Sequence, residues 1–484
     1  MKNNKVLLTK NKAFVFLFSL LYFISFLLLF SRKGIGLYFH PYEIDSFMDL
    51  FNMAVSPFNS TYPPLSLISF KLLYLLPHPE VVCASIDLRN NYCGAFFLML
   101  YIFAFCSFFL FTMYFSIRGN TKRKIIYSTL FLFSGIVLWT TERANMMSFA
   151  FIFSLLFVIF YLDGNEKKKR LSYIFIAIAI SLKFYPGAFL LLLLEKKDFK
   201  GILCVSLNTF VIFVFSYIVC KQLDSVIKFE QSMGLFNYMK DAKAYIKVMT
   251  HLFVAFLIFV VACFFIYEVY MQNWKYVRVI GGVSFAAFAP AVYILCFAKN
   301  VNLLSVVSAP FLPAIQALNF GTEMTASVEG VNVSFKNFTL LVHYLLTGGI
   351  SISKQWFFLL GKTVCVALCI VSFACNKKIW KKLACVSLLC IYVPDFSVMY
   401  LLVYLLIPLV FFINDVQNDN VDYFYACLFA ITTTFLVIPY KFKVESHYLL
   451  TGSFIVISLC VFCLLLLLFA NAVYELMSKK REKK

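Results

Sequence analysis

The sequence predicts an all-α polytopic membrane protein with about 12–14 transmembrane segments, two of them broken hairpins. Of its 484 residues, 62% are hydrophobic and only 14% are charged, whereas soluble globular chains carry roughly 45–50% apolar residues. Lys and Arg gather in short segments between long apolar runs. A bilayer accepts apolar side chains on the outside of a fold, so these observations exclude a water-soluble fold.

Ten uninterrupted apolar runs are long enough to cross the hydrocarbon core as helices of about 17–22 residues. The first has a basic flank but no small-residue cleavage site, so it is predicted to be a span and not a signal peptide. The ten runs are 13–31, 94–117, 124–140, 146–162, 201–220, 252–270, 279–297, 356–375, 422–439 and 448–472.

The net charge of +20 is explained by membrane topology, because no polar stretch is long enough to form a soluble nucleic-acid-binding domain. The positive-inside rule assigns the basic segments to the cytoplasm. Every intervening number of crossings is then even, which predicts that both termini are cytoplasmic. The segments are 2–12, 118–124, 167–170, 196–200, 275–278, 377–382 and 479–484.

Two further apolar segments are too short for two full spans, although both ends of each are predicted to be cytoplasmic. They lie between Arg170 and Lys196 and between residues 382 and 414. Hairpins of short half-helices reconcile these lengths, with turns at Lys183-Phe-Tyr-Pro186 and at Val393-Pro-Asp395. Irregular backbone at membrane depth needs cover from protein or water, so the turns are predicted to face a cavity.

No repeat or linker divides the chain, so residues 1–484 are predicted to form a single domain. The large outer loops are predicted at 32–93 and 298–355. The first of them contains Cys83 and Cys93, and the sequence leaves open whether an oxidising compartment joins these two residues.

Three carboxylates fall within seven residues after the first span, namely Glu43, Asp45 and Asp49. In a helix, Asp45 and Asp49 would lie at positions i and i+4 on one face, where the like charges raise the pKa of one of them. A carboxylate of this kind suits a general base. The alternative is a solvated loop that carries charge without chemistry.

The same loop continues with Tyr62-Pro-Pro-Leu65, a rigid extended segment. The apolar stretch 65–76 that follows is too short to span a bilayer and is predicted to lie along the interface.

Two polar sites are predicted at the outer ends of later spans. Glu142, Arg143 and Asn145 form one, and its alternative interpretation is an interfacial anchor. The second is Lys183 at the tip of the first hairpin. A Lys at membrane depth is a candidate functional group, here a point charge for a phosphate, and the alternative is a structural ion pair.

Taken in order, these motifs resemble the GT-C superfamily of integral membrane glycosyltransferases, specifically the polyprenyl-phosphate-sugar-dependent branch that includes bacterial phosphoinositide mannosyltransferases. The likeness covers mainly residues 1–200 and 380–415. Ala144 departs from the family pattern, in which the corresponding residue is usually Gly. The motifs are Asp45-Ser-Phe-Met-Asp49-Leu-Phe-Asn52, Tyr62-Pro-Pro-Leu65, Glu142-Arg-Ala-Asn145, Leu182-Lys-Phe-Tyr-Pro186, and Tyr400 to Tyr404 with Pro408.

The resemblance implies an inverting transferase that moves a hexose, mannose-like, from a polyprenyl-phosphate donor to a glycolipid or polysaccharide precursor at the outer face of a bacterial cytoplasmic membrane. It implies a carboxylate base, for which Asp45 is preferred and Asp49 is the second choice. Neither a cofactor nor a metal ion is expected. Substrate-binding roles are implied for Glu43, Tyr62, Glu142, Arg143, Asn145, Lys183, Tyr185, Asp395 and Tyr400.

Two other functions stay open at this point. An O-antigen-type polysaccharide polymerase also has many spans and a large outer loop, but such proteins rely on Arg in that loop, and residues 298–355 contain none. A lipid-linked sugar flippase or transporter would also use broken helices, although no repeated pair of halves is visible in the sequence.

Overall fold

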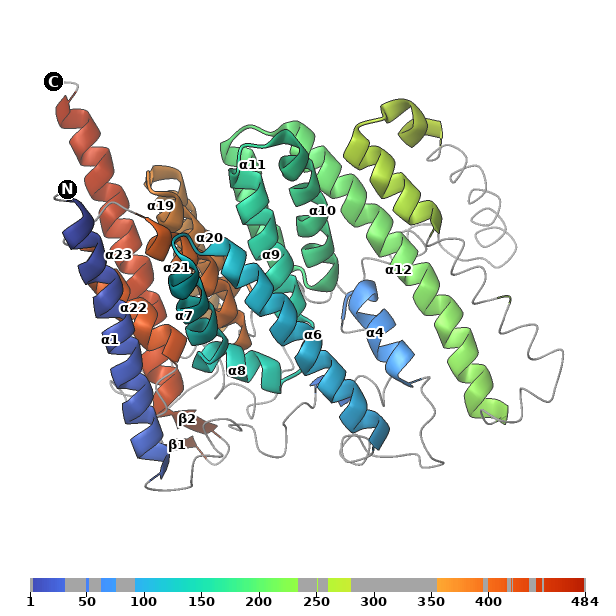
Figure 1. Ribbon diagram of the computed structural model, residues 1–484, viewed down its shortest axis with the longest axis horizontal. Helices are drawn as coiled ribbons and strands as arrows, with labels where there is room; N and C mark the ends of the chain where they lie inside the picture. The colour runs from blue at the N-terminus through green and yellow to red at the C-terminus, as the bar shows by residue number, and fades with distance from the viewer. Residues whose placement is uncertain are drawn as a thin grey trace. The chain divides into compact units, whose positions relative to one another are not determined.

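The computed structural model of the protein describes residues 3–30, 49–51, 62–74, 92–233, 250, 260–279, 355–394, 399–415, 419, 421–434, 441–445 and 448–482. Nearly all of these residues are helical (Figure 1), which confirms the predicted fold class. The exception is a short antiparallel hairpin of β1 (Lys441–Glu445) and β2 (Tyr448–Thr451), with Lys441 opposite Thr451. The predicted span 448–472 therefore begins only at Gly452, where α23 starts.

The chain divides into two compact units. Unit 1 comprises Met1–Ser46, Ile102–Phe151 and Phe320–Lys484, and unit 2 comprises Phe47–Tyr101 and Ile152–Asn319. Helices α6 (Tyr92–Ser116) and α9 (Met147–Leu162) have residues in both. The single domain of residues 1–484 stays a prediction.

Unit 1 is a helical bundle in which α1, α22 and α23 lie side by side (Figure 1). Its centre is aromatic. The ring of Trp380 is 4.9 Å from that of Phe412 and 4.8 Å from that of Tyr425, both edge to face. The helices of unit 1 are α1 (Asn3–Phe30), α7 (Thr121–Leu132), α8 (Gly135–Glu142), α19 (Gln355–Cys375), α20 (Ile379–Tyr392), η5 (Met399–Leu405), α21 (Leu406–Asn414), α22 (Asp422–Thr434) and α23 (Gly452–Glu482).

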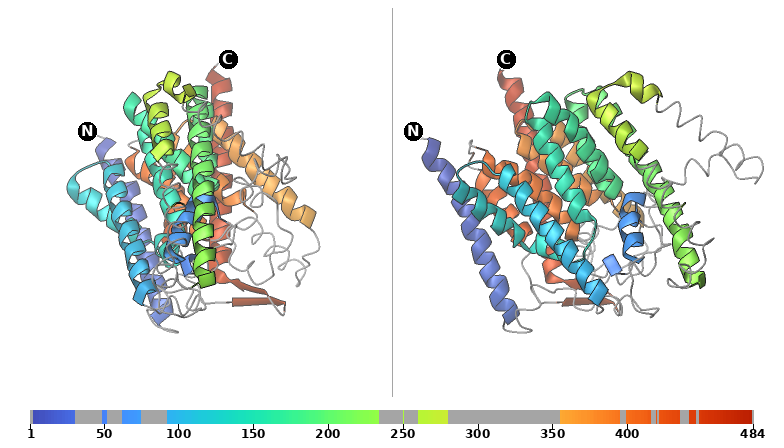
Figure 2. Two further views of the ribbon diagram at one scale, coloured as in Figure 1. Left: turned by 90° about the vertical axis from the view of Figure 1, so that its right-hand side faces the viewer. Right: turned by 45° about the vertical axis from the view of Figure 1, so that its right-hand side comes forward.

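Unit 2 is built around the long helix α12 (Phe199–Met233), with α4 (Pro64–Tyr74) and α10 (Glu166–Leu182) packed against it. The blue α4 lies beside the green α12 in Figure 1 and in the turned views of Figure 2. Helix α4 covers residues 64–74, and the interfacial position of the stretch 65–76 stays a prediction.

The predicted span 124–140 is wrong as one straight helix. It consists of α7 and α8, which are bent by 53° at a short break. Ser134 and Gly135 lie at the break, and a Ser or Gly pair is a common cause of a kink. The Ser134 hydroxyl donates to the carbonyl of Phe131 at 2.7 Å, which stabilises the end of α7.

Both predicted interruptions are present. Helix α10 ends at Leu182, and the chain continues as a 3₁₀ helix, η2 (Tyr185–Leu190), and then as α11 (Leu191–Glu195). In the second hairpin, α20 is followed by η5 and α21. The outgoing arm α10 is longer than a half-helix. The return arm contains a 3₁₀ segment, which rises about 2.0 Å per residue instead of about 1.5 Å, so fewer residues cover the distance.

By length and apolarity, three helical segments within the described part of the chain could cross a membrane: Leu98–Ser116, Phe199–Lys228 and Ser453–Ser478. The bent pair α7 and α8 makes a fourth if it counts as one span. Large apolar side chains are exposed on these helices, for example Phe103 at 71%, as expected for a surface that faces lipid. The chain is therefore an integral membrane protein, and the figure of 12–14 spans stays a prediction.

The basic ends of both units contain paired charges. In unit 2, Asp198 accepts hydrogen bonds from the Tyr173 hydroxyl at 2.6 Å and the Gly201 amide at 3.0 Å, and it forms an ion pair with Lys169 at 3.0 Å. Burial raises the pKa of Asp198, but these bonds outweigh it and hold the pKa below its ordinary value. A Cβ atom at Gly201 would lie 2.8 Å from the Tyr173 ring, so the site requires glycine.

In unit 1 the central cation is Lys378, whose ammonium lies 2.8 Å from Asp419 and 3.8 Å from both Asp415 and Asp422. Burial lowers the pKa of Lys378, but the three carboxylates more than offset this effect and raise the pKa above its ordinary value. Trp380 also donates to Asp415 at 3.1 Å. This cluster fixes the start of α20 to the end of α21 and to the start of α22.

Candidate active site

Lys183 lies in the turn between α10 and η2, in the broken hairpin of unit 2. It follows the last residue of α10 in an extended conformation (φ −152°, ψ 141°), and its amide still donates to the carbonyl of Ala179 at 3.0 Å. Its ammonium lies 3.8 Å from the centroid of the Tyr62 ring, well within the distance of about 6 Å at which a cation is attracted to an aromatic face. Two residues predicted from separate motifs are thus in contact.

Asp49 belongs to the same group of residues. The described residues here are 49–51, which are helical, and Leu50 and Phe51 are buried. The Asp49 carboxylate is close enough to interact electrostatically with the Lys183 ammonium. Asp49, Tyr62 and Lys183, all in unit 2, form the candidate site.

Tyr62 is positioned by the prolines that follow it. Pro64 is the first residue of α4, the helical position at which a missing N–H costs least. The carbonyl of Pro63 accepts from the Leu67 amide at 3.2 Å, so the helix ladder begins directly after Tyr62. The Tyr62 ring packs edge to face on Phe70 at 5.3 Å.

Three contacts anchor α4 to its neighbours. The Ser66 hydroxyl donates to the carbonyl of Leu182 at 2.7 Å, next to Lys183. The Cys220 thiol lies 3.3 Å from the carbonyl of Pro64. Lys71, whose side chain is 3% exposed, forms an ion pair with Asp224 of α12. These contacts fix the distance between the Tyr62 ring and the end of α10.

Sequence reasoning missed Ser66, Lys71 and Asp224 as supports of the site. A signal for Lys71 was present, because a lysine inside an apolar stretch requires a partner. Asp224 gave no comparable signal, because it lies beyond the predicted span 201–220, which the structure extends as α12 to Met233.

The second polar motif lies in unit 1. Helix α8 ends at Glu142, and Arg143 and Ala144 form the turn that leads into α9. Glu142 is 3% exposed and Asn145 is fully buried. The Asn145 side chain accepts from the Met147 amide at 3.0 Å, which makes it a capping residue of α9.

Ala144 has φ +49°, in the left-handed region that L-residues other than Asn and Asp rarely adopt. This backbone explains why glycine suits the corresponding position of the proteins that the motif resembles. Alanine in place of glycine at this position therefore strains the backbone locally and leaves the polar side chains of the motif unchanged.

Tyr400 lies in η5, the element against which α8 packs within unit 1. Tyr185 is the first residue of η2, two residues after Lys183. Glu43, Asp45, Asp395 and Cys83 lie outside the described residues, as does the whole outer loop 298–355 except its last residue.

Within the described part of the chain, no group of three or more His, Cys, Asp or Glu side chains could hold a metal ion. Cys460 and Cys463 have C-x-x-C spacing in α23, and both are free thiols. The expectation that the chemistry needs neither metal nor cofactor stays a prediction.

The chain is thus a polytopic helical membrane protein with a carboxylate and an ammonium group near one aromatic ring. The model of glycosyltransferase family 87 matches residues 61–312, more than half of the chain, and the chain belongs to this family. It is a membrane glycosyltransferase. No curated protein and no solved structure shows significant similarity to it.

The matched region contains Tyr62, Glu142, Arg143, Asn145 and Lys183, whereas Asp49 precedes it. Membership of a glycosyltransferase family favours the enzyme over the flippase or transporter that the sequence left open.

Proposed function

We propose that the protein transfers a hexose, mannose-like, from a polyprenyl-phosphate donor to a hydroxyl of a glycolipid or polysaccharide precursor, with inversion at the anomeric carbon. The reaction takes place at the outer face of a bacterial cytoplasmic membrane. The observation that carries the proposal is the Lys183 ammonium over the face of the Tyr62 ring, with the Asp49 carboxylate near enough to act on its charge, because phosphoryl-linked sugar transfer needs a base and a cation in one site.

In the proposed step, Asp49 accepts the proton of the acceptor hydroxyl while the oxygen of that hydroxyl attacks the anomeric carbon. The new glycosidic C–O bond forms as the bond from that carbon to the phosphate oxygen breaks. The electron pair of the broken bond remains on the lipid phosphate, and Lys183 stabilises the charge that develops there. One displacement inverts the anomeric carbon, as in inverting enzymes that act on glycosides.

We prefer Asp49 to Asp45 as the base in this proposal, because the Asp49 carboxylate is near enough to the Lys183 ammonium to act on its charge. Asp45 remains an alternative base. We propose that Glu142, Arg143, Asn145 and Tyr400 orient the substrates. The same role is proposed for Glu43, Tyr185 and Asp395.

The base assignment is tested with purified, folded protein and a radiolabelled polyprenyl-phosphate hexose. Replacement of a general base lowers turnover by about 10²–10⁴-fold, so Asp49→Asn is expected to lose at least about 100-fold. The matched control is Asp163→Asn, since Asp163 is an exposed carboxylate that forms an ion pair with the surface residue Lys168. Asp163→Asn should leave turnover unchanged.

Asp45→Asn is measured alongside these variants. Near-normal turnover of both Asp49→Asn and Asp45→Asn would overturn the carboxylate mechanism. Analysis of the product by NMR tests the stereochemistry separately, since retention at the anomeric carbon would exclude the single displacement.

A further inference from the structure

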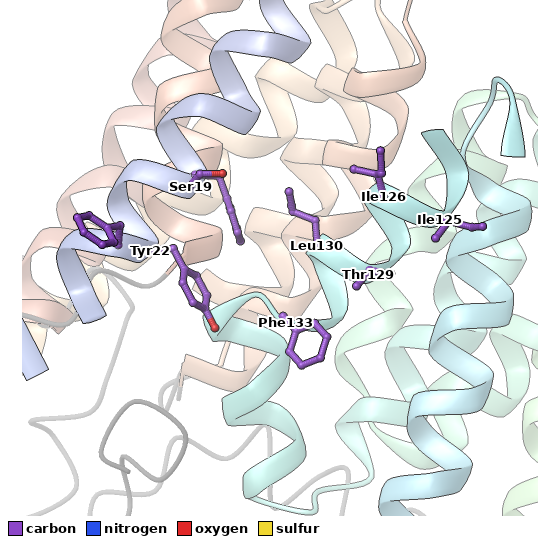
Figure 3. Close-up of a pocket in the computed structure, with 9 residues that line it drawn as sticks. Ser19, Tyr22, Ile125, Ile126, Thr129, Leu130 and Phe133 are labelled. Atoms are coloured by element: carbon purple, nitrogen blue, oxygen red, sulfur yellow. The ribbon is translucent and has the colours of Figure 1, made fainter. Parts of the chain in front are cut away.

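An apolar groove runs between α1 and α7 in unit 1 (Figure 3). Its volume is about 850 Å³, in the upper part of the range of about 300–1,000 Å³ that is typical of small-molecule sites. Ser19, Tyr22 and Thr129 supply its few hydroxyl groups. The groove belongs neither to the candidate active site nor to any motif of the sequence analysis.

The walls of the groove are apolar and open to the surroundings. Phe23 of α1 is 57% exposed, and Ile125 and Phe133 of α7 are 53% and 50% exposed. The rings of Phe14 in α1 and Phe131 in α7 pack edge to face, with their centroids 6.4 Å apart. Such walls are unfavourable in water, but in a bilayer they accept a hydrocarbon chain.

A lysine lies on each of the two helices, beyond the same end of the groove. On α7, Lys122 precedes Ile126 and Leu130 at spacings of four and eight residues, so the three share a face. On α1, Lys12 precedes Ser19 by seven residues, or two turns. In Figure 3 both helices run in the same direction along the groove, from Ser19 to Tyr22 and from Ile126 to Phe133.

These two lysines are accessible. Both are exposed, and neither makes an ion pair or a side-chain hydrogen bond with any other residue that the structure describes. The neighbouring Arg123 differs, because its guanidinium donates to the carbonyl of Ile413 at 2.8 Å. An apolar groove with exposed lysines at one end complements a molecule that has a hydrocarbon tail and an anionic head.

We propose that the groove between α1 and α7 binds one acyl chain of an anionic phospholipid, with the lipid headgroup at Lys12 and Lys122. Both lysines belong to basic segments that the positive-inside rule assigns to the cytoplasmic side, where polybasic segments attract anionic lipids. This proposal is independent of the sugar, the donor and the catalytic residues proposed above.

Native mass spectrometry of the full-length protein tests it, with phosphatidylglycerol and phosphatidylcholine of identical acyl chains as probes. Phosphatidylglycerol should be retained preferentially. Lys122→Ala should weaken its retention roughly fivefold, which corresponds to about 1 kcal/mol for one cation near a membrane surface.

The matched control is Lys167→Ala. Lys167 is also exposed and is also the second residue of a helix, and Asn165 caps α10 as Asn120 caps α7. Equal retention of the two lipids, or equal losses in Lys122→Ala and Lys167→Ala, would overturn the proposal.

The tail is tested independently of the head. Thr129→Trp fills the groove and should lower the retention of phosphatidylglycerol, whereas Leu203→Trp at an exposed position of α12 should not. In the wild-type protein, phosphatidylglycerol with a photoreactive acyl chain should label peptides from residues 18–23 and 125–133.

Labelling confined to other segments would refute the assignment even if a variant failed to fold. Polyprenyl phosphate that displaced phosphatidylglycerol at equal concentration would overturn it too, because the groove would then hold the donor lipid instead of a phospholipid.

Discussion

The ammonium of Lys183 lies over the face of the Tyr62 ring, so the ring is expected to hold the cation in place by its aromatic face and not by its hydroxyl. A cation–aromatic contact contributes about 0.5–2 kcal/mol. Tyr62→Leu should therefore lower kcat/KM for the lipid donor by up to roughly 30-fold, and Tyr62→Phe should stay close to wild type. Steady-state kinetics with purified protein measure both variants.

Lys183→Met gives the reference value in the same assay. A loss in Tyr62→Phe as large as that in Tyr62→Leu would contradict the aromatic role and would point to the hydroxyl instead.

Ala144 allows a second test at the residue scale. Its left-handed backbone costs an L-residue roughly 1–2 kcal/mol, whereas glycine adopts this conformation freely. Loss of the buried methyl group offsets part of the gain, so Ala144→Gly is expected to stabilise the protein by up to about 1 kcal/mol. Thermal unfolding in detergent measures the change.

Ala150→Gly is the matched control, because Ala150 is equally buried but lies inside α9. It should destabilise the protein by about 0.5–1 kcal/mol or more, since glycine is unfavourable inside a helix. The same sign for both changes would argue against strain at Ala144.

At the scale of elements, the ion pair of Lys71 and Asp224 is expected to anchor α4 to α12. Removing one partner of a buried pair leaves an uncompensated charge, which costs about 3–5 kcal/mol. The loss of stability in Lys71→Met should lie at or below the lower end of this range, because Asp224 is 18% exposed and also lies 3.9 Å from Lys221. The thermal unfolding midpoint in detergent measures this loss.

The double variant Lys71→Met, Asp224→Leu should recover most of the lost stability, since no charge is then left buried alone. If the double variant is as unstable as the sum of the two single changes, the pair is not the anchor.

Asp198 plays the corresponding role at the other end of unit 2. Its folded-state pKa lies below its unfolded value, so the stability it contributes is present above the ordinary carboxylate pKa and is lost as the pH falls through the lowered one. Asp198→Asn should cost about 1.5–3 kcal/mol, as expected for hydrogen bonds to a charged group. The stability difference between wild type and Asp198→Asn should be equal at pH 5 and pH 8, and it should become smaller only in stronger acid.

Asp163→Asn should stay within about 1 kcal/mol of wild type, because its ion pair with Lys168 is exposed. Thermal melts of both variants across this pH range make the comparison. A deficit of Asp198→Asn that grows on acidification from pH 8 to pH 5 would contradict the assigned direction.

Hydropathy and charge predicted the helical class and both interrupted hairpins, because a bilayer imposes apolar runs and basic ends on any chain that crosses it. The order of the motifs assigned Tyr62 and Lys183 to one site, and their side chains are in contact. The bend at Ser134 was missed, since the apolar pattern continues through it. The sequence marked Ala144 only as a departure from the usual Gly, without its left-handed backbone. Asp224 was missed because a tertiary partner leaves no local pattern.

On the scale of the whole molecule, unit 2 has two separate polar ends. Asp198 and Lys169 join α10 and α12 at one end, whereas α4 links the other end of α10, at Leu182, to Asp224. The long apolar segment of α12 separates the two ends. This segregation is expected of a unit that crosses a bilayer, with its basic end on the cytoplasmic side.

Topology reporters test the resulting orientation in bacterial cells. Green fluorescent protein fused after Lys200 or after Lys484 should fluoresce, because both positions are predicted to be cytoplasmic. Alkaline phosphatase fused after Lys228 should be active, since Lys228 lies one turn beyond Asp224 and thus at the same end of α12 as the candidate site. The phosphatase fused after Lys200 is the inactive control. Phosphatase activity after Lys200 together with fluorescence after Lys228 would invert unit 2 and would place Tyr62 and Lys183 at the cytoplasmic face.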